Sequence, residues 1–200
     1  MDENSAFYLP QQHETERLLL RMWQPGDGQL LHEAIEDSFP ELHAWMDWAK
    51  VMPTLPETEN VVREAAQKFV NRQEFNFIIL RKSDRLVVGT VGIHHIRWDV
   101  PRFELGYWCR TRTTGQGYIT EAVRKLTHYL FDELGAERVE IRCDARNVRS
   151  AAVARRAGFL LEAVLRREAR SNDDSLRDTQ IYAMLREDFA ALSESSPPLP

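Results

Sequence analysis

The sequence lacks the features on which small extracellular proteins and membrane proteins depend. Only two of its 200 residues are cysteines, too few for a disulfide framework, so we expect a reducing, cytoplasmic compartment. No run of about 18 apolar residues occurs, which excludes a membrane-spanning helix. The first residues, MDENSAFYLP, are polar and acidic and do not resemble a secretory signal. A soluble protein is therefore expected.

The chain also lacks a strong charge of either sign. Its formal net charge of -5 and the absence of interleaved basic and aromatic residues argue against nucleic acid as the main partner. Residues 1–100 carry 10 Lys and Arg against 16 Asp and Glu, whereas residues 101–200 carry 16 against 15. This asymmetry either reflects solvated surface or indicates an anionic ligand on the second half and a cationic one on the first. No His, Cys or carboxylate spacing is typical of zinc, so no metal is expected.

The composition that is present, 43% hydrophobic and 28% charged, suits one globular domain with a full core. Apolar periodicity predicts a mixed α/β fold over residues 1–192 and a disordered tail over residues 193–200. The expected order is a strand, two helices, three strands, a helix, a strand, a helix and two final strands. The clearest segments are the strands at 15–23, 75–82, 85–98, 102–110 and 138–144, a turn that runs into a helix over residues 25–39, and the helices at 57–72, 117–135 and 147–158.

The second half of the chain predicts a particular sheet topology. The three strands at 75–110 are separated by short turns and should form an antiparallel meander. The strand at 102–110, the following helix and the strand at 138–144 form a βαβ unit, so these two strands should be parallel. Gly135 is expected to cap the first helix of this half, and Asn147 is expected to begin the second.

A glycine-rich stretch, R-T-T-G-Q-G at 112–117, separates the strand from the helix of this unit. A helix N-terminus offers unpaired N–H groups and the positive end of a dipole, and Gly115 and Gly117 lack the Cβ atoms that would keep an anion away. The stretch is neither a P-loop nor the dinucleotide fingerprint. Taken alone, it indicates either an anion cradle or an ordinary turn.

Five blocks with a consistent order and spacing carry a resemblance to a known family. They are T-E-R-L-L-L-R at 15–21, E-L-G-Y-W at 104–108, R-T-T-G-Q-G-Y at 112–118, T-E-A-V at 120–123 and R-C-D-A-R-N-V-R-S-A-A-V-A-R-R-A-G-F at 142–159. From Thr15 to about Asp188 the chain resembles the GNAT superfamily of N-acetyltransferases, and in particular its Rim-type branch, which includes ribosomal-protein N-terminal acetyltransferases. The resemblance implies the GNAT fold, with acetyl-CoA as cosubstrate and two parallel strands that splay to admit the pantetheine arm.

The expected cofactor site combines the splay with the glycine-rich stretch. Backbone groups at the end of the first splayed strand lose their ladder partners and can pair with pantetheine, and the Cys109 N–H can donate to the thioester carbonyl. The side chains of Cys109 and Cys143 are either small buried hydrophobes or nucleophiles, and direct transfer needs no nucleophile. The expected cofactor-binding residues are Trp108, Cys109, Arg110, Arg112, Gly115, Gln116, Gly117, Tyr118, Ile119 and Asn147.

Two residues are expected to be catalytic. Glu104 begins the strand that ends at the cradle and is either a solvated carboxylate or the base, acting directly or through water. The resemblance implies the base, because Rim-type enzymes carry Glu at this position. Many GNAT enzymes use as acid a tyrosine seven residues after the helix-starting Asn, but that position holds Ala154. The resemblance assigns assistance of the CoA thiolate to Ser150, which is otherwise an ordinary first-turn serine.

Histidines and tryptophans are further candidates for the acceptor side. His94 and His95 are adjacent on a predicted strand and should face opposite sides, with one lining the acceptor cleft or both serving the structure. Trp45 and Trp48 either wall the acceptor site or belong to the core. The acidic residues around them favour a cationic acceptor.

Three functions remain open from the sequence. The first is an Nα-acetyltransferase acting on a protein or peptide terminus, which suits a carboxylate base because an α-amino group has a pKa of about 7.7–8.0 against about 10.4 for lysine. The second is the same fold acting on a small amine such as a polyamine, an aminoglycoside or an amino-acid derivative. The third is a module that senses acyl-CoA without turnover, and the joint presence of Glu104 and Ser150 counts against it. A homodimer is left open.

Overall fold

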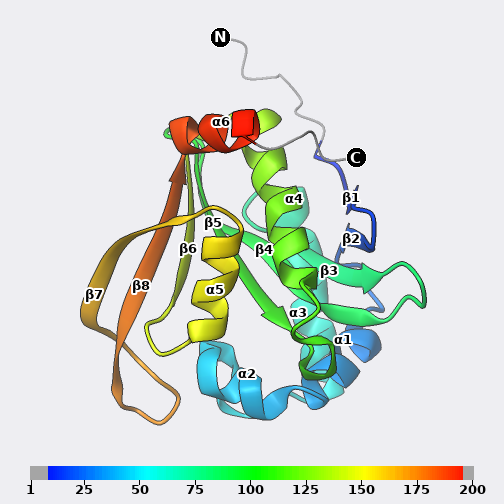
Figure 1. Ribbon diagram of the computed structural model, residues 1–200. Coiled ribbons are helices and arrows are strands. Elements are labelled where there is room, and N and C mark those ends of the chain that lie inside the picture. The colour runs from blue at the N-terminus through cyan, green and yellow to red at the C-terminus, as the bar shows by residue number, and fades with distance from the viewer. Residues whose placement is uncertain (1–8, 196–200) are drawn as a thin grey trace.

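An eight-stranded sheet organises the computed structural model, which describes residues 9–195 (Figure 1). The strand order is β1-β2-β3-β4-β5-β6-β8-β7, and β5 and β6 are parallel whereas the other neighbours are antiparallel. This arrangement confirms the predicted mixed α/β fold with its meander and βαβ unit. The strands are β1 (Gln12–Glu14), β2 (Leu18–Met22), β3 (Phe75–Arg81), β4 (Val87–Arg97), β5 (Arg102–Cys109), β6 (Arg138–Asp144), β7 (Leu160–Arg170) and β8 (Leu176–Leu185).

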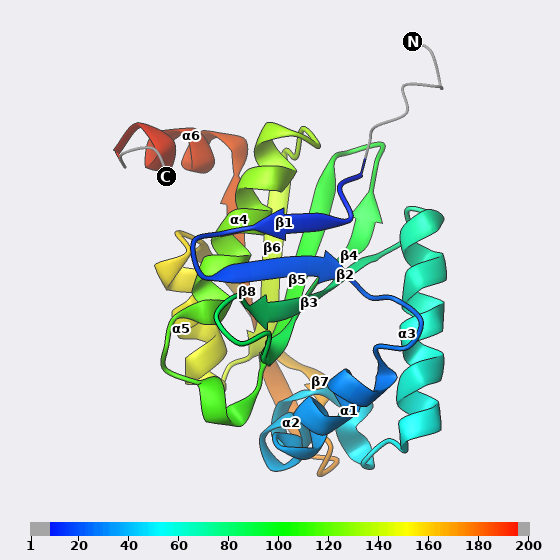
Figure 2. The ribbon, with the colours of Figure 1, turned by 90° about the vertical axis from the view of Figure 1, so that its right-hand side faces the viewer.

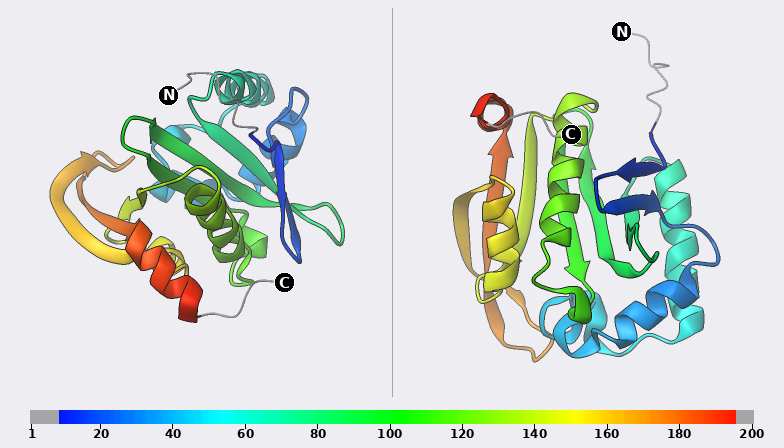
Figure 3. Two further views of the ribbon diagram at one scale, coloured as in Figure 1. Left: turned by 90° about the horizontal axis from the view of Figure 1, so that it is seen from above. Right: turned by 45° about the vertical axis from the view of Figure 1, so that its right-hand side comes forward.

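Helices pack on both sides of the sheet, as Figures 2 and 3 show. On one side, Leu31, Leu42 and Val62 of three successive helices bury apolar side chains together with Trp108 of β5. On the other side, Leu126 and Ala154 belong to a larger core. The helices are α1 (Gly28–Glu36), α2 (Phe39–Trp45), α3 (Leu55–Val70), α4 (Tyr118–Asp132), α5 (Val148–Arg156) and α6 (Arg186–Ser195), with short 3-10 turns η1 (Asp47–Lys50) and η2 (Thr111–Thr113).

The parallel pair is joined only at its beginning. Residues 102–104 of β5 are in register with residues 138–140 of β6, and no pairing between the two described strands follows. Both strands continue, β5 beside β4 as far as Cys109 and β6 beside β8 as far as Asp144. The splay that the family resemblance implies is therefore present in the middle of the sheet.

The structure confirms one of two expected helix caps. The Asn147 side chain accepts the Ser150 N–H at 3.0 Å, which confirms Asn147 as the N-cap of α5. Gly135 does not cap α4 directly, because that helix ends at Asp132 and its cap residue Glu133 keeps a right-handed conformation. Gly135 lies two positions later with φ +66, where the chain turns toward β6.

Some elements differ from the sequence prediction. Strand β1, helix α2, turn η1 and helix α6 were not predicted. Helix α6 extends to Ser195, into the first residues of the tail expected over residues 193–200, and the disorder of that tail stays a prediction. Residues 196–200 lie outside the described part. The sequence signal for the start of α6 is the acidic residue Asp188 in its first turn. In the structure the Asp188 carboxylate accepts the Leu185 N–H at 3.0 Å.

A buried histidine on β1 links folding to pH. His13 is 6% exposed and packs between Phe77 and Tyr129, with ring-centroid distances of 5.3 and 4.5 Å. Within the described part of the chain its Nε2 has no hydrogen-bond partner. Burial, helped by the positive charge of Lys125, lowers the pKa of His13 from 6.5 to about 4. The folded protein therefore holds this ring neutral.

We expect the free energy of unfolding to fall as the pH is lowered from about 6.5 to about 4. Because the folded pKa lies below the unfolded one, the unfolded chain takes up the proton first. The loss is about 1.4 kcal/mol per pH unit, or about 3 kcal/mol in all. Urea unfolding at several pH values measures it, and the same series on His13→Leu should lack this contribution. Identical pH dependence in the two proteins would contradict the assignment.

Candidate active site

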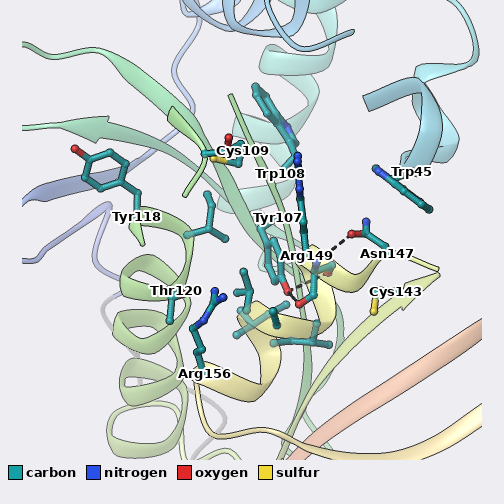
Figure 4. A pocket seen from close by; sticks show the side chains of 18 of the residues that line it. Trp45, Tyr107, Trp108, Cys109, Tyr118, Thr120, Cys143, Asn147, Arg149 and Arg156 are labelled. Carbon is teal, nitrogen blue, oxygen red and sulfur yellow. Dashed lines mark hydrogen bonds between the residues drawn. The ribbon is translucent and has the colours of Figure 1, made fainter. Parts of the chain in front are cut away.

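The splay opens into a cleft of about 1940 Å³ (Figure 4). Its walls come from the end of β5, the loop before α4, the first turns of α4, the second half of β6, and α5. Trp45 approaches from the α2 side, while Thr120 and Arg156 lie on the side of α4 and α5. Beyond Glu104 and Glu140, backbone groups that β5 and β6 would otherwise offer to each other face this space without a ladder partner from the opposite strand.

The glycine-rich loop has the backbone that the sequence predicts for an anion cradle. Gly115 and Gly117 adopt φ values of +77 and +81, and Gly117 is the N-cap of α4. A Cβ added to Gly115 would meet no atom within 4 Å, so the space beside it is open. The first N–H groups of α4, beginning at Tyr118, have no partner inside the helix and stand at the positive end of its dipole. A phosphate group fits this arrangement.

Contacts from the β1–β2 connection hold the cradle in place. Arg17 donates to the Gln116 carbonyl at 3.1 Å and to the Glu121 carboxylate at 2.7 Å. The Thr15 hydroxyl donates to the other oxygen of Glu121 at 2.5 Å. The Arg17 guanidinium also lies 4.7 Å from the centre of the Tyr118 ring. The first matched block of the sequence, T-E-R, thus fixes the loop and the first turn of α4.

Two predicted cofactor-binding arginines turn away from the cleft. Arg110 is 5% exposed and pairs with Asp37 at 2.5 Å, and Arg112 pairs with the same carboxylate at 3.2 Å. Neither residue lines the cleft. The same segment is held by the Thr111 N–H, which donates to the Ser38 hydroxyl at 3.0 Å, so these contacts attach the cradle to the end of α1. The other predicted cofactor residues, Trp108, Cys109, Gly115, Gln116, Gly117, Tyr118, Ile119 and Asn147, all line the cleft.

The two predicted catalytic residues lie on the cleft wall but come from opposite sides of the sheet. Glu104 belongs to the same β5 face as Trp108, which packs toward α1 and α3. Ser150 is in the first turn of α5, and its hydroxyl is 3.1 Å from the hydroxyl of Tyr107 on the other β5 face. The splay therefore has a carboxylate on one side and a pair of hydroxyl groups on the other.

Tyr107 is a site residue that the sequence reasoning missed. Its hydroxyl donates to the Ser150 carbonyl at 3.1 Å in addition to its contact with the Ser150 side chain (Figure 4). Burial raises the pKa of this hydroxyl above its ordinary value, although the Ser150 hydrogen bond acts in the opposite direction. It therefore stays protonated at neutral pH. Its position within the matched block E-L-G-Y-W was the available signal.

Both cysteine thiols line the cleft in their neutral form. Burial raises the pKa of Cys109 and of Cys143 above the ordinary thiol value. Cys109 contacts the Thr113 hydroxyl at 3.6 Å. These surroundings favour small buried hydrophobes over nucleophiles. Among residues 9–195, no group of three His, Cys, Asp or Glu side chains is arranged as a set of metal ligands.

The cleft is enclosed on its α2 side by residues far apart in the sequence. Trp45 and Trp48 line it and are 37% and 46% exposed, so they are not core residues. The Asn172 amide donates to the His43 and Met46 carbonyls at 2.8 and 3.0 Å and so ties the β7–β8 loop to α2. Nearby, Arg177 of β8 lies 3.4 Å from Asp47 of η1. These contacts join the two walls at this end of the cleft.

The prediction that His94 and His95 face opposite sides of the sheet is wrong. A β-bulge follows His94, and His95 adopts φ +47. The His95 ring reaches Glu104, the residue directly across from His94, with 3.0 Å between Nδ1 and Oε2. A bulge places two residues of one strand opposite one residue of its partner, which the period of two cannot anticipate.

No helix in the described ranges is both long enough and apolar enough to cross a membrane. Comparison with known proteins identifies relatives of most of this chain. A family model described as an acetyltransferase (GNAT) domain matches residues 17–160. YdaF of Bacillus subtilis (strain 168), whose provisional name is ribosomal N-acetyltransferase, is 30% identical over 153 residues, covering 76% of this chain and 82% of YdaF.

Two further comparisons agree with these. The ribosomal-protein-serine acetyltransferase of Escherichia coli (strain K12) is 28% identical over 144 residues, covering 70% of this chain and 79% of that protein. The solved complex of RimL, a ribosomal L7/L12 alpha-N-protein acetyltransferase, with coenzyme A superposes with a TM-score of 0.80 at 24% identity. It covers 87% of this chain and 97% of that one, so the likeness in fold extends through nearly all of both proteins.

Proposed function

Because this chain belongs to the GNAT family of acetyltransferases, in its Rim-type branch, we propose that it acetylates the α-amino group of a protein or peptide terminus with acetyl-CoA as donor. The observation that carries this proposal is the splay between β5 and β6, with Glu104 on one side and the Tyr107–Ser150 hydroxyl pair on the other. Acceptor and donor can then meet from the two sides of the sheet.

The residues present fit acetyl-CoA at the cradle and along the splay. Gly115 leaves open space where a side chain would stand, and the N–H groups at the start of α4 can hold the pyrophosphate. The backbone groups at the end of β5 that have no partner on β6 can form hydrogen bonds with the pantetheine amides, so the pantetheine arm takes the place of the missing strand. The side chains of Arg110 and Arg112 contribute to this site indirectly, by fixing the loop through Asp37.

The chemistry follows from where charge develops. In the proposed reaction Glu104 takes a proton from the acceptor amine, whose nitrogen attacks the thioester carbon. The backbone N–H of Cys109 donates to the carbonyl oxygen as it becomes negative. The departing sulfur meets the Tyr107–Ser150 hydroxyl pair, and a thiol pKa of about 8.5 means that a single donated hydrogen bond suffices for a good leaving group.

A chain end fits the acceptor side better than the middle of an extended chain. The contacts of Asn172 with α2 and of Arg177 with Asp47 join the two walls, so a segment with chain on both sides of the reacting amine meets an obstruction at this end. Trp45 and Trp48 offer exposed aromatic surface for the residues that follow the terminus. The names of two relatives, one a ribosomal N-acetyltransferase and the other a ribosomal-protein-serine acetyltransferase, support the same acceptor class.

The test is a panel of amines incubated with the protein and acetyl-CoA, with products detected by intact mass. The panel contains Ser- and Ala-starting peptides that also carry a lysine, the same peptides with a blocked α-amine, polyamines and aminoglycosides. We expect acetylation of the free-terminus peptides and none of the blocked ones. Acetylation of small amines alone would replace the proposal by the small-amine function, and no product with any acceptor would favour an acyl-CoA sensor.

A further inference from the structure

The β-bulge beside Glu104 contains one extra residue in β4. His94 is in register with Glu104 and Arg97 with Arg102, so three steps along β4 match two steps along β5. His95 takes up this difference with φ +47. Positive φ is unfavourable for residues with a Cβ and persists where the surroundings enforce it, often at functional sites. Some contact in the folded protein must therefore offset the cost of this backbone conformation.

Burial of the His95 side chain does not offset this cost, because the side chain is 74% exposed. The contact that the bulge creates is polar, with His95 Nδ1 3.0 Å from Glu104 Oε2. Without the bulge, the period of a strand would turn His95 to the other side of the sheet from Glu104. The extra residue thus converts an outward-facing histidine into a partner of the carboxylate.

Glu104 has no competing ion pair among the described residues. Its neighbour on β6 is Glu140, whose charge is compensated by Arg138 at 2.7 Å. Across β4, His94 lies over Gly92 and Gly106, and its Nδ1 is 3.8 Å from the Glu74 carboxylate. Burial lowers the pKa of His94, which favours its neutral form. The orientation of the Glu104 carboxylate consequently depends on His95.

We propose that His95 is the positioning residue for Glu104. Its Nδ1–H donates to Oε2 and fixes the carboxylate rotamer, which leaves Oε1 free to receive the proton of the acceptor amine. This inference rests on the proposed function, in which Glu104 is the base. It assigns to the bulge a role in orientation, and orientation of a reacting group affects the turnover rate far more than substrate binding.

Two variants at one position separate the hydrogen bond from the backbone conformation. His95→Gly removes the donor and accepts φ +47 without strain, whereas His95→Asn also tolerates this conformation but keeps an amide N–H. We expect His95→Gly to lower kcat by about 10- to 100-fold with KM for both substrates within about twofold. His95→Asn should recover most of that loss, and the thermal midpoint of His95→Gly should equal or exceed that of the parent protein.

A matched control is His32→Asn, which removes a histidine–carboxylate pair on α1 with 3.7 Å between His32 Nε2 and Glu36 Oε1. His32 does not line the cleft, so its kcat should stay within about twofold of the parent value. Equal kcat in His95→Gly and the parent protein would overturn the positioning role. Equal losses in the Gly and Asn variants would also overturn it, because the donated hydrogen bond would then be irrelevant.

Glu104→Gln distinguishes failure of this inference from failure of the proposed function. If Glu104→Gln is inactive while His95→Gly is fully active, the base assignment stands and the positioning role falls. If Glu104→Gln retains full kcat, the base assignment itself fails. Combining the two substitutions should add no further loss to Glu104→Gln, and an additional tenfold loss would show that His95 acts by another route and overturn the inference.

Discussion

Replacing Glu104 with glutamine is expected to lower kcat by a factor of about 10² to 10⁴, the range found when a general base is removed. Glutamine keeps the shape of the side chain and loses only the ability to take the proton from the acceptor amine. The cofactor contacts proposed for the cradle and for the end of β5 do not involve this side chain. Acetyl-CoA affinity, measured by calorimetry, should therefore remain within about twofold while initial rates fall.

Glu140→Gln provides the matched control for this prediction. Glu140 is the residue of β6 in register with Glu104, and it pairs with Arg138 at 2.7 Å without lining the cleft. Its replacement should change kcat by less than about threefold, as expected for a carboxylate with no contact to substrate. Full activity of Glu104→Gln, or an equal loss in both variants, would remove Glu104 from the mechanism.

The second large effect is expected at Gly89, where alanine should lower the free energy of unfolding by about 3 kcal/mol or more. Gly89 has φ +150, and an added Cβ would lie 2.1 Å from the Trp108 carbonyl oxygen. That atom is backbone and cannot rotate away, so β4 and β5 would have to separate. For a chain of this size the thermal midpoint should fall by about 6–12 °C, measured by calorimetric or circular-dichroism melting.

Gly135→Ala separates the clash from the cost of the backbone conformation. Gly135 has φ +66, and a Cβ added there would meet no atom within 4 Å. Its replacement should cost about 1 kcal/mol, the strain of a left-handed residue with a side chain. If Gly89→Ala were no more destabilising than Gly135→Ala, the close approach of Gly89 to Trp108 would not matter for stability.

Much of the fold was predictable because its elements carry regular periods. The apolar runs of β3, β4 and β5 and the amphipathic stripe of α4 gave the meander and the βαβ unit, which the structure confirms. The elements that were missed are short or locally ambiguous. Strand β1 has only three residues, and α2 contains Pro40 at its start, beside Phe39, in a segment without a clear apolar stripe.

The site was predictable where function depends on the backbone and less so where it depends on long-range pairing. Gly115 and Gly117 indicated a site where a ligand can approach the backbone, and both line the cleft. Arg110 is also among the expected cofactor-binding residues, but its side chain pairs with Asp37, 73 residues away in sequence. The His95 contact with Glu104 depends on a single extra residue in β4. The alternation of apolar and polar residues does not reveal where a strand contains such an extra residue.

The splay leaves the sheet unfinished in its own interior. β5 and β6 each have one side without the other strand over their final residues, a situation that globular proteins normally permit only at the outer edge of a sheet. A molecule that pairs with these groups therefore acts as part of the folded structure as well as a reactant. By mass action it stabilises the native state by RT ln(1 + [L]/Kd). The melting temperature of the protein should consequently rise with the free concentration of any ligand that occupies the gap between β5 and β6.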